Sequence, residues 1–463
     1  MIALPSIVKP PKGGALHWGQ IPIASHGLLA AELASSLDAP VLLLTADTAS
    51  AYQLEQNMQF FAEGLPVKLL PDWETLPYDN FSPHEDIVSE RLRTLSELTT
   101  MRRGILVAPI STLMQRIAPP DYVSKHSLIL NVGQTLDIDS FRQQLEKSGY
   151  RHVDTVYQHG EYASRGAIID IFPMGSESPY RIDLLDEEID SLRSFDPETQ
   201  RGIESVKHIN LLPGKELPLD EDGITLFRRN WHERFNVDHR KCPIYQDVSD
   251  GIAPAGIEYY LPLFFKQTGT LFDYLPANSW LLSSAGIEGA AEHYWQDIQQ
   301  RYEQRIGDIR RPVLPPATVF QTVPEIFSRL KDYPRVTISE ATLPDSAGSY
   351  NFAIDSSPPL NIDSKQDDPI AALREYCRDR RVLFCAESAG RREALIDLLT
   401  RHKLKPKPVS GWREFTTGSD SINITIAPLD EGISGSATKP FALIAESQLF
   451  GKRVSQSRRR KKA

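Results

Sequence analysis

The sequence reads Val41-Leu-Leu-Leu-Thr-Ala46 in a short apolar run, and a helical pattern begins a few residues later. Within that pattern Leu54, Met58 and Phe61 recur at helical spacing, which predicts a helix over residues 50–63. A continuous apolar run of this length is typical of a strand buried on both faces, as in parallel sheets. The run therefore predicts a strand–helix unit of an α/β domain.

The same pattern repeats farther along the chain. Residues 86–100 have the spacing of a helix, and the apolar run over residues 104–110 predicts a second buried strand. Between the two units, residues 70–84 are rich in proline and aromatic side chains, which predicts an ordered loop. Residues 1–118 are therefore expected to form the first part of a layered α/β domain.

The character of the sequence changes near residue 119. A short amphipathic helix is predicted over residues 140–147, and strand patterns separated by turns dominate residues 149–196. Residues 119–212 are therefore predicted to form a small α+β insert. Helical patterns return over residues 213–340, which indicates that the interrupted domain resumes there.

The last third of the chain contains a linker pattern and another α/β pattern. Residues 341–368 are rich in proline, serine, aspartate and glycine and have no periodicity, which predicts a linker. Residues 369–451 alternate helical patterns with apolar runs, which predicts a small α/β domain. Its strands are expected at residues 382–386, 422–427 and 441–445.

The charge is unevenly distributed along the chain. Seven of the 51 basic residues lie in a tail at residues 452–463, which contains no acid. Residues 1–451 therefore hold 44 basic against 61 acidic residues, a net charge of −17, whereas the whole chain has −10. An acidic body argues against a dedicated duplex-binding module, which usually presents a basic face. The tail is interpreted as a solvated connector, with a nucleic-acid contact as the alternative.

Length and composition limit the class of protein. At about 150 residues per domain, 463 residues predict roughly three domains, and 41% hydrophobic with 24% charged residues is typical of globular proteins. Apolar runs far shorter than ~20 residues and an N-terminus unlike a signal peptide predict no membrane segment and a cytoplasmic location. Three cysteines, Cys242, Cys377 and Cys385, fit no zinc-ligand spacing and are expected to be buried.

The sequence carries no recognisable catalytic template. An α/β domain invites a search for a phosphate-binding loop, but Gly-Lys-Thr and Gly-Lys-Ser are absent from the chain. At the expected place stand residues 19–27, Gly-Gln-Ile-Pro-Ile-Ala-Ser-His-Gly, whose bulky side chains block a backbone nest and which supply no lysine. No nucleophile elbow and no zinc-helix motif is present either. We therefore expect no catalytic, cofactor-binding or metal-binding residues.

Two strand segments, residues 159–173 and 179–196, carry the most informative surface pattern. Side chains alternate along a strand, so the second segment predicts one core face and one outer face. The core face is expected to hold Tyr180, Ile182 and Leu184, and the outer face Arg181, Asp183 and Leu185.

The first of these segments adds another arginine to the pattern. Arg165 is expected at the end of a strand, sharing one face with Ala167, Ile169 and Ile171. Arginines beside an exposed apolar residue have the composition of an interface hot spot. A solvated hairpin with incidental arginines is the alternative interpretation.

Three motifs carry a resemblance to a known family. They are Asp72-Trp-Glu-Thr-Leu-Pro-Tyr-Asp79, Tyr162-Ala-Ser-Arg-Gly-Ala-Ile-Ile-Asp-Ile-Phe-Pro173 and Asp186-Glu-Glu-Ile-Asp-Ser-Leu-Arg-Ser-Phe-Asp196. With these motifs the chain resembles the N-terminal part of the bacterial transcription-repair coupling factor family (Mfd). The signature Arg-Gly-x-Ile-x-Asp-Ile-Phe-Pro within the second motif also occurs in the excision-repair protein UvrB.

The resemblance implies an α/β multidomain fold. A degenerate helicase-like α/β domain, residues 1–118 and 213–340, would be split by an inserted α+β UvrA-binding domain at residues 119–212. A linker at 341–368 and a small α/β domain at 369–451 would follow. In the family the helicase-like domain has lost its Walker A loop, so no cofactor is expected for this chain, although the full-length family uses ATP as a translocase.

The resemblance also implies a partner and the residues that bind it. The family contacts UvrA through two arginines that match Arg165 and Arg181, and through an aromatic position that is occupied here by Leu185. RNA polymerase and duplex DNA would be partners only through C-terminal parts of the full-length family that this chain lacks. Those parts mask the UvrA-binding surface in the full-length family, so this chain is expected to bind UvrA without a stalled polymerase.

The sequence is compatible with three functions. The resemblance favours a recruitment module that couples stalled transcription to nucleotide excision repair and is not itself an enzyme. An ATP-dependent DNA helicase or translocase is the enzymatic alternative, and a DNA-binding scaffold is the third. DNA-stimulated ATPase activity or strong salt-dependent DNA binding by this chain would favour the second or third function.

Overall fold

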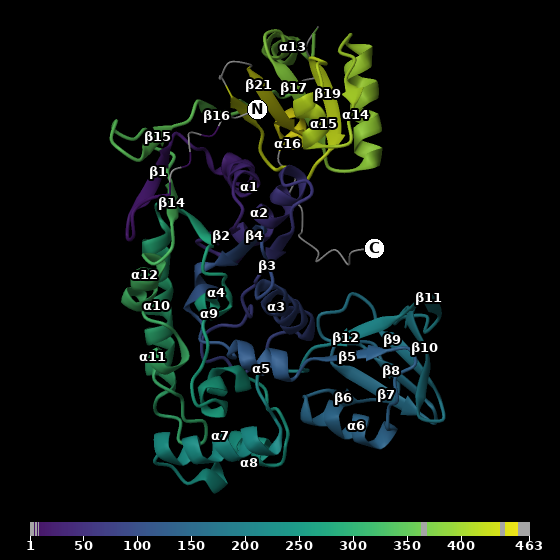
Figure 1. The fold of residues 1–463 in the computed structure, drawn as a ribbon. Helices are drawn as coiled ribbons and strands as arrows, with labels where there is room; N and C mark the ends of the chain where they lie inside the picture. Colours follow the sequence, from purple (N-terminus) through teal and green to yellow (C-terminus); the bar gives the residue numbers. More distant parts are fainter. Residues whose placement is uncertain (1–3, 5–6, 8, 363–367, 436–439, 452–463) are drawn as a thin grey trace.

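The computed structural model describes residues 4, 7, 9–362, 368–435 and 440–451. Three regions are visible in Figure 1: a central α/β domain, a separate sheet-rich region formed by the middle of the first half of the chain, and a C-terminal α/β domain. The basic tail predicted at residues 452–463 lies outside the described residues.

The central domain is built on a seven-stranded sheet in which every neighbouring pair is parallel. The strand order is β15-β1-β14-β13-β2-β4-β3. The strands are β1 (Ala15–Gly19), β2 (Pro40–Thr45), β3 (Val67–Leu69), β4 (Gly104–Pro109), β13 (Trp280–Ser284), β14 (Arg335–Ile338) and β15 (Ser349–Asn351). The buried strands predicted at 41–46 and 104–110 are confirmed as β2 and β4, which are neighbours.

Helices cover both faces of this sheet, as the continuous apolar runs predict. In β2 alternate side chains enter different cores: Val41 and Leu43 pack with α1 (His26–Ser36) and α2 (Thr48–Phe61). Leu42 and Leu44 pack on the other face with α3 (Glu85–Leu98) and α10 (Ile287–Arg305). The remaining helices of the domain are η1 (Ile23–Ser25), α4 (Ile110–Met114), α5 (Pro120–Lys125), α7 (Glu221–Arg234), η2 (His239–Lys241), α8 (Pro243–Ser249), η3 (Ile257–Phe264), α9 (Leu271–Tyr274), α11 (Pro316–Val319) and α12 (Val323–Leu330).

The inserted region contains a second, largely antiparallel sheet of order β11-β10-β9-β8-β7-β6. Its strands are β6 (Arg151–His152), β7 (Glu161–Arg165), β8 (Ile168–Ile171), β9 (Tyr180–Leu185), β10 (Glu188–Phe195) and β11 (Gly202–Val206). A separate pair, β5 (Leu128–Asn131) with β12 (His208–Leu211), carries the chain into and out of this region. Helix α6 (Ile138–Lys147) buries Phe141 and Leu145 in the same core as the inner face of the sheet.

The two ends of the inserted region remain attached to the central domain. Helix α5, which the sequence prediction placed in the insert, packs against α3. The Tyr122 hydroxyl of α5 donates to the Lys215 carbonyl oxygen at 3.0 Å, so the outgoing and returning chain segments lie side by side. The sheet-rich part therefore starts at β5, several residues later than the change in sequence character.

The segment predicted as a linker, residues 341–368, contributes to two sheets. Strand β15 pairs with β1 at the edge of the central sheet, and β16 (Ile354–Ser356) pairs with β20 in the C-terminal sheet. Each strand has only three residues, which is too short to show an alternating pattern. The described part of this segment is thus structured backbone that joins two domains.

The C-terminal domain has a six-stranded mixed sheet of order β16-β20-β21-β17-β19-β18. Its further elements are α13 (Ala371–Cys377), β17 (Arg381–Ala386), α14 (Ala389–Arg401), β18 (Lys407–Pro408), α15 (Trp412–Thr417), β19 (Ile422–Ile426), β20 (Ile433–Gly435), β21 (Phe441–Ala445) and α16 (Glu446–Phe450). Trp412 packs edge-on against Phe61 of α2, with ring centroids 5.3 Å apart, and both belong to one core. The C-terminal and central domains are therefore joined by buried aromatic contacts.

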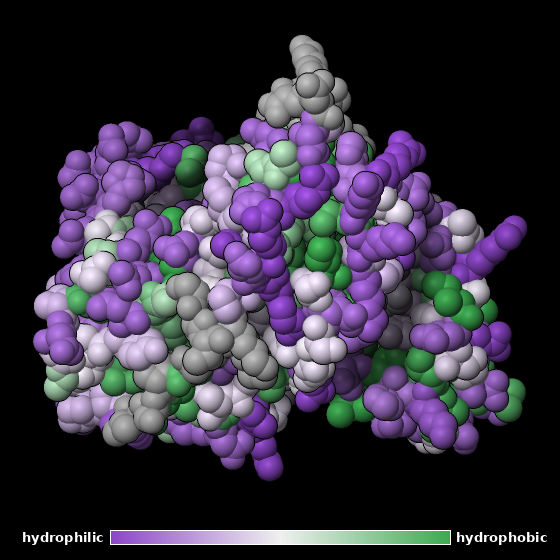
Figure 2. Space-filling model, turned by 90° about the horizontal axis from the view of Figure 1, so that it is seen from above, coloured by the Kyte–Doolittle hydropathy of each residue, from purple (hydrophilic) through white to green (hydrophobic). Residues whose placement is uncertain are grey.

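The surface is mixed in character. Hydrophilic residues dominate the face seen from above, and apolar residues occur there in small groups (Figure 2). Among the described residues, no helix combines the length and the apolar character that crossing a bilayer requires. Cys242, Cys377 and Cys385 are free and buried, which confirms the prediction for them.

Candidate partner-docking surface

The outer face of the inserted sheet carries the predicted site residues. Strand β9 places Ile182 and Leu184 in the core and leaves Leu185 68% exposed, which confirms the predicted alternation. Arg181 lies on the same outer face as Leu185, because the two are four residues apart on one strand. Tyr180 packs only partly against the core.

Arg165 occupies a different place from the one predicted. Strand β7 ends at Arg165, and a turn at Gly166, with a φ of +62°, reverses the chain into β8. Ile169 and Ile171 lie on β8 and are fully buried, so Arg165 does not share a strand face with them. The sequence prediction was wrong here because a two-residue turn interrupts what looked like one continuous alternation.

The observed register nevertheless places Arg165 on the outer face. Arg165 pairs with Ile168, and Ile168 pairs with Asp183, two residues from Arg181 along β9. Residues directly opposite each other in adjacent strands project to the same side of a sheet. With strands ~4.8 Å apart and ~3.4 Å per residue, the Cα atoms of Arg165 and Arg181 are about 12 Å apart.

Arg181 is held by an ion pair that lies within the sheet. Its Nε donates to Asp170 Oδ1 at 2.7 Å and its Nη2 donates to Asp170 Oδ2 at 2.9 Å. The side chain of Arg181 is 30% exposed, whereas that of Asp170 is 5% exposed. The guanidinium also lies over the Phe195 ring, 5.2 Å from its centroid. The hydrogen bonds to Asp170 raise the pKa of Arg181 above its usual value, so this arginine is a fixed cation.

Arg165 is held by a loop rather than by a carboxylate. Its Nη2 donates to the Asp154 carbonyl oxygen and, at 3.2 Å, to Thr155 Oγ1. These neutral partners leave the positive charge of Arg165 uncompensated within the described contacts. Exposed apolar side chains lie on the same sheet, at Ile168, Leu185 and Ile203. Arginines next to exposed aliphatic groups have the composition of a protein-binding surface.

Sequence reasoning missed Asp170, Arg193 and Phe195. Asp170 is a charged residue between buried isoleucines in Ile169-Asp170-Ile171, and that interruption of an apolar strand was the available signal. Its pairing with Arg181 depends on the register of β8 against β9, which no local pattern specifies. Phe195 is fully buried at the end of β10 in a small cluster with Val156, Ala163 and Phe172.

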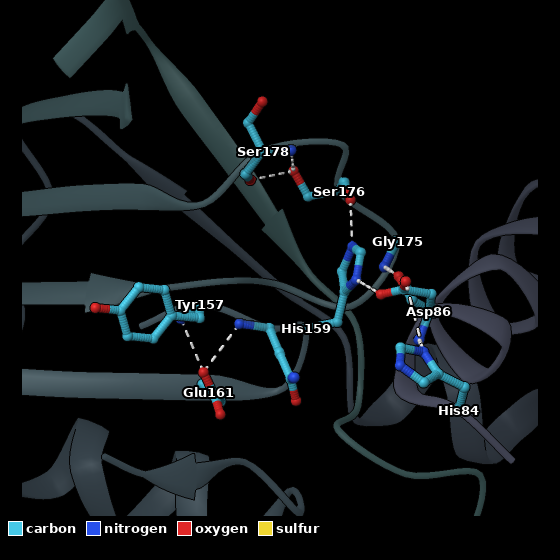
Figure 3. A network of polar contacts seen from close by, with 10 residues as sticks. His84, Asp86, Tyr157, His159, Glu161, Gly175, Ser176 and Ser178 are labelled. Carbon is cyan, nitrogen blue, oxygen red and sulfur yellow. Dashed lines mark hydrogen bonds and ion pairs between the residues drawn. The ribbon is translucent and has the colours of Figure 1, made fainter. Parts of the chain in front are cut away.

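A polar network anchors the six-stranded inserted sheet, β6 to β11, which we call the docking sheet, to the central domain, as Figure 3 shows. His159, just before β7, places Nδ1 2.8 Å from Asp86 Oδ1 at the start of α3, and Nε2 2.8 Å from the Ser176 carbonyl oxygen. The His159 ring lies 4.0 Å from the Phe172 ring, centroid to centroid. Glu161 accepts hydrogen bonds from the backbone amides of residues 157 and 158, both at 2.9 Å, which shapes the loop before β7.

The place of a phosphate-binding loop in the central domain is filled by backbone. The amide of Gln20 donates to the Ala341 carbonyl oxygen at 3.0 Å, and the amide of Ile21 donates to the Ser339 carbonyl oxygen at 3.1 Å. Pro22 has no N–H. Burial lowers the pKa of His26, the first residue of α1, to about 4, so this side chain supplies no positive charge near neutral pH.

No group of three or more possible metal ligands is found among the described residues. The described side chains of the docking surface are arginine, aspartate and aliphatic groups, without a histidine or cysteine cluster.

Two family models match the chain. One, described as the UvrB interaction domain, matches residues 128–217, which begin at β5 and extend past β12. The other, described as the MFD D3 domain, matches residues 375–449 of the C-terminal domain. The fold and the docking sheet thus define an α/β multidomain protein with an inserted UvrB interaction domain.

Comparison with individual proteins shows which proteins the chain resembles over most of its length. The chain is 44% identical over 443 residues to the transcription-repair-coupling factor of Escherichia coli strain K12, covering 95% of this chain and 38% of that protein. It is 41% identical over 448 residues to the transcription-repair-coupling factor of Haemophilus influenzae strain Rd, covering 96% of this chain and 39% of that protein. A further relative of the same name from Bacillus subtilis strain 168 is 27% identical over 273 residues, 56% of this chain and 23% of that protein.

The chain is therefore similar over nearly its whole length to transcription-repair-coupling factors, and parts of it match the models of the UvrB interaction domain and the MFD D3 domain. It spans less than two fifths of the length of the E. coli and H. influenzae relatives.

Proposed function

We propose that this chain is a recruitment module that binds the excision-repair protein UvrA and thereby couples stalled transcription to nucleotide excision repair. The observation that carries the proposal is the coincidence of two findings. The UvrB interaction model matches residues 128–217, and the sheet in that range presents Arg165, Arg181 and Leu185 on its outer face.

The proposed site residues have separate roles. Arg181 supplies a charge that is fixed in direction by Asp170, and Arg165 supplies a charge without an acidic partner among the described contacts. Leu185, at the end of β9, supplies the apolar part of the contact. Arginine is among the residues at which interface energy usually concentrates.

The proposal includes the absence of catalysis. The amides of Gln20 and Ile21 are engaged by backbone carbonyls, and residues 19–27 contain no lysine, so we propose that this chain binds no ATP there and needs no cofactor. RNA polymerase and duplex DNA are proposed as partners of other regions of longer relatives. We further propose that the chain acts in the cytoplasm and binds UvrA without a stalled polymerase.

A binding titration tests the proposal. The purified chain is titrated against UvrA by biolayer interferometry, alongside an Arg165→Ala plus Arg181→Ala variant and a Lys147→Ala variant. Lys147 lies at the end of α6, which covers the inner face, so its variant shows the effect of losing a cation away from the outer face. We expect the double variant to lose about thirtyfold or more in affinity and the control to bind like wild type. Absence of wild-type binding, or undiminished binding by the double variant, would overturn the proposal.

A further inference from the structure

Three charged residues form a row across three strands of the docking sheet. Asp170 of β8 is directly opposite Arg181 of β9, and Arg181 is directly opposite Arg193 of β10. Residues in such positions have Cβ atoms about 5 Å apart and project to the same face. The row therefore has the order carboxylate, guanidinium, guanidinium.

The three members of the row have different environments. Asp170 is almost fully buried and uses both carboxylate oxygens on Arg181. The side chain of Arg193 is 56% exposed, and its Nη2 lies 3.9 Å from Asp183 Oδ2, beyond hydrogen-bond distance. Asp183 instead accepts a 2.9 Å hydrogen bond from Ser191 Oγ. Arg193 is thus only loosely compensated.

Two like charges directly opposite each other destabilise a sheet. Here Asp170 and the Phe195 ring hold the guanidinium of Arg181, and Arg193 is the residue directly opposite Arg181 on β10. Asp170 takes the edge formed by Nε and Nη2. Within the described contacts Nη1 of Arg181 has no hydrogen-bond partner, so a second edge of the guanidinium remains available to a partner.

We infer that Arg181 and Arg193 together form a carboxylate-binding pair that receives an acidic side chain of UvrA, and that Asp170 is the positioning residue that aims Arg181 at it. This inference rests on the proposed function. An acidic side chain between the two guanidiniums would relieve their repulsion and accept charge-assisted hydrogen bonds from both. Arginine is suited to this task because its planar fork matches a carboxylate in two-point contact.

The pairing also predicts how the residues depend on one another. Asp170 does not contact the partner and acts only by positioning Arg181. Removing the Asp170 carboxylate should therefore weaken UvrA binding only while Arg181 is present. Arg193 contacts the partner directly, so its removal weakens binding whether or not Asp170 is intact. A double-mutant cycle separates these two behaviours.

The experiment measures UvrA affinity for Arg193→Ala, Asp170→Asn, Arg181→Ala and the Asp170→Asn plus Arg181→Ala double variant, with thermal unfolding of each as a folding check. Glu325→Gln, a change at a carboxylate of the central domain that pairs with Arg116, is the control for Asp170→Asn. We expect about tenfold weaker binding for Arg193→Ala and for Asp170→Asn, and no further loss when Asp170→Asn is added to Arg181→Ala. Binding by wild type should also decrease more steeply with salt than binding by Arg193→Ala.

The outcomes distinguish this inference from the function on which it rests. If Arg165→Ala plus Arg181→Ala is impaired while Arg193→Ala binds within twofold of wild type, the carboxylate-binding pair is refuted and the proposed function stands. If Asp170→Asn weakens binding equally with and without Arg181, Asp170 acts through the fold and the positioning role is refuted. Arg193 is exposed, so its variant remains informative even if Asp170→Asn does not fold.

Discussion

Arg91 of α3 and Glu216, just after the inserted region, form a buried ion pair in which Arg91 Nε lies 2.7 Å from Glu216 Oε1. Their side chains are 0% and 4% exposed. Arg91 Nη1 donates to the Pro71 carbonyl oxygen at 2.6 Å, and Trp73 Nε1 donates to Glu216 Oε2 at 2.7 Å. The chain that returns from the docking sheet is thus tied to the helix that precedes it by a hydrogen-bonded network.

Removing one member of this pair is expected to destabilise the central domain strongly. Arg91→Ala leaves the Glu216 carboxylate buried without its cation, which usually costs about 3–5 kcal/mol in the free energy of unfolding. Urea unfolding followed by tryptophan fluorescence measures the change. Arg240→Ala, which breaks an exposed pair with Asp238, is the control and should leave stability close to that of wild type. Equal stability of Arg91→Ala and wild type would contradict this assignment.

Glu258 is expected to make stability dependent on pH. Burial raises the pKa of this carboxyl from 4.5 to about 7, with Ser82 Oγ donating to it at 2.9 Å. Between pH 4.5 and about 7 the Glu258 carboxyl holds a proton in the folded chain and releases it in the unfolded chain. The contribution of Glu258 to the free energy of unfolding therefore decreases as the pH rises from about 4.5 to 7. Glu258→Gln should therefore be more stable than wild type at pH 8, by on the order of 3 kcal/mol, and similar to it near pH 4.5. Thermal unfolding at both pH values checks this, and a difference that is independent of pH would rule it out.

The elements predicted correctly are those whose environment is visible in a short window of sequence. Strands β2 and β4 are buried on both faces, so their apolar runs are continuous. Strands β13 and β14 were not predicted, because Trp280-Leu-Leu-Ser-Ser284 and Arg335-Val-Thr-Ile338 are short and partly polar. Strand β13 owes its position to pairing with β2, more than 200 residues away in sequence, and with β14. Such pairing is a tertiary preference that local patterns do not contain.

In the candidate site, too, features set by local sequence were predicted and features set by strand pairing were not. Period-two alternation placed Leu185 outside and Ile182 inside correctly, since it requires only that the segment is a strand. The contact between Asp170 and Arg181 requires the register of two strands joined by an irregular connection, and so it could not be predicted. The error at Arg165 has the same origin, because the turn at Gly166 decides which strand each residue joins.

Leu185 offers a test of the apolar part of the proposed contact. The side chain is exposed at the end of β9, so replacing it does not disturb the core. Leu185→Phe enlarges the apolar area offered to UvrA, and at about 25 cal/mol per Å² an extra ~30 Å² of burial should tighten binding about threefold. Leu185→Asp should weaken binding at least tenfold, because a carboxylate would be desolvated in an apolar contact. Affinities measured by interferometry decide this, and wild-type affinity for Leu185→Asp would place Leu185 outside the interface.

The segment at residues 19–27 predicts that the chain neither binds nor hydrolyses ATP there. A phosphate-binding loop needs free backbone amides and a lysine, whereas the amides of Gln20 and Ile21 already donate to carbonyl oxygens and Pro22 has none. The Asn351 side chain lies against Gly19 and binds both backbone groups of Leu343 at 2.8 Å. Asn351→Ala would open this place without supplying a lysine, so we expect neither wild type nor the variant to show saturable ATP binding in equilibrium dialysis or DNA-stimulated ATP hydrolysis. Hydrolysis that co-elutes with the chain through successive columns would contradict the prediction and favour the translocase alternative.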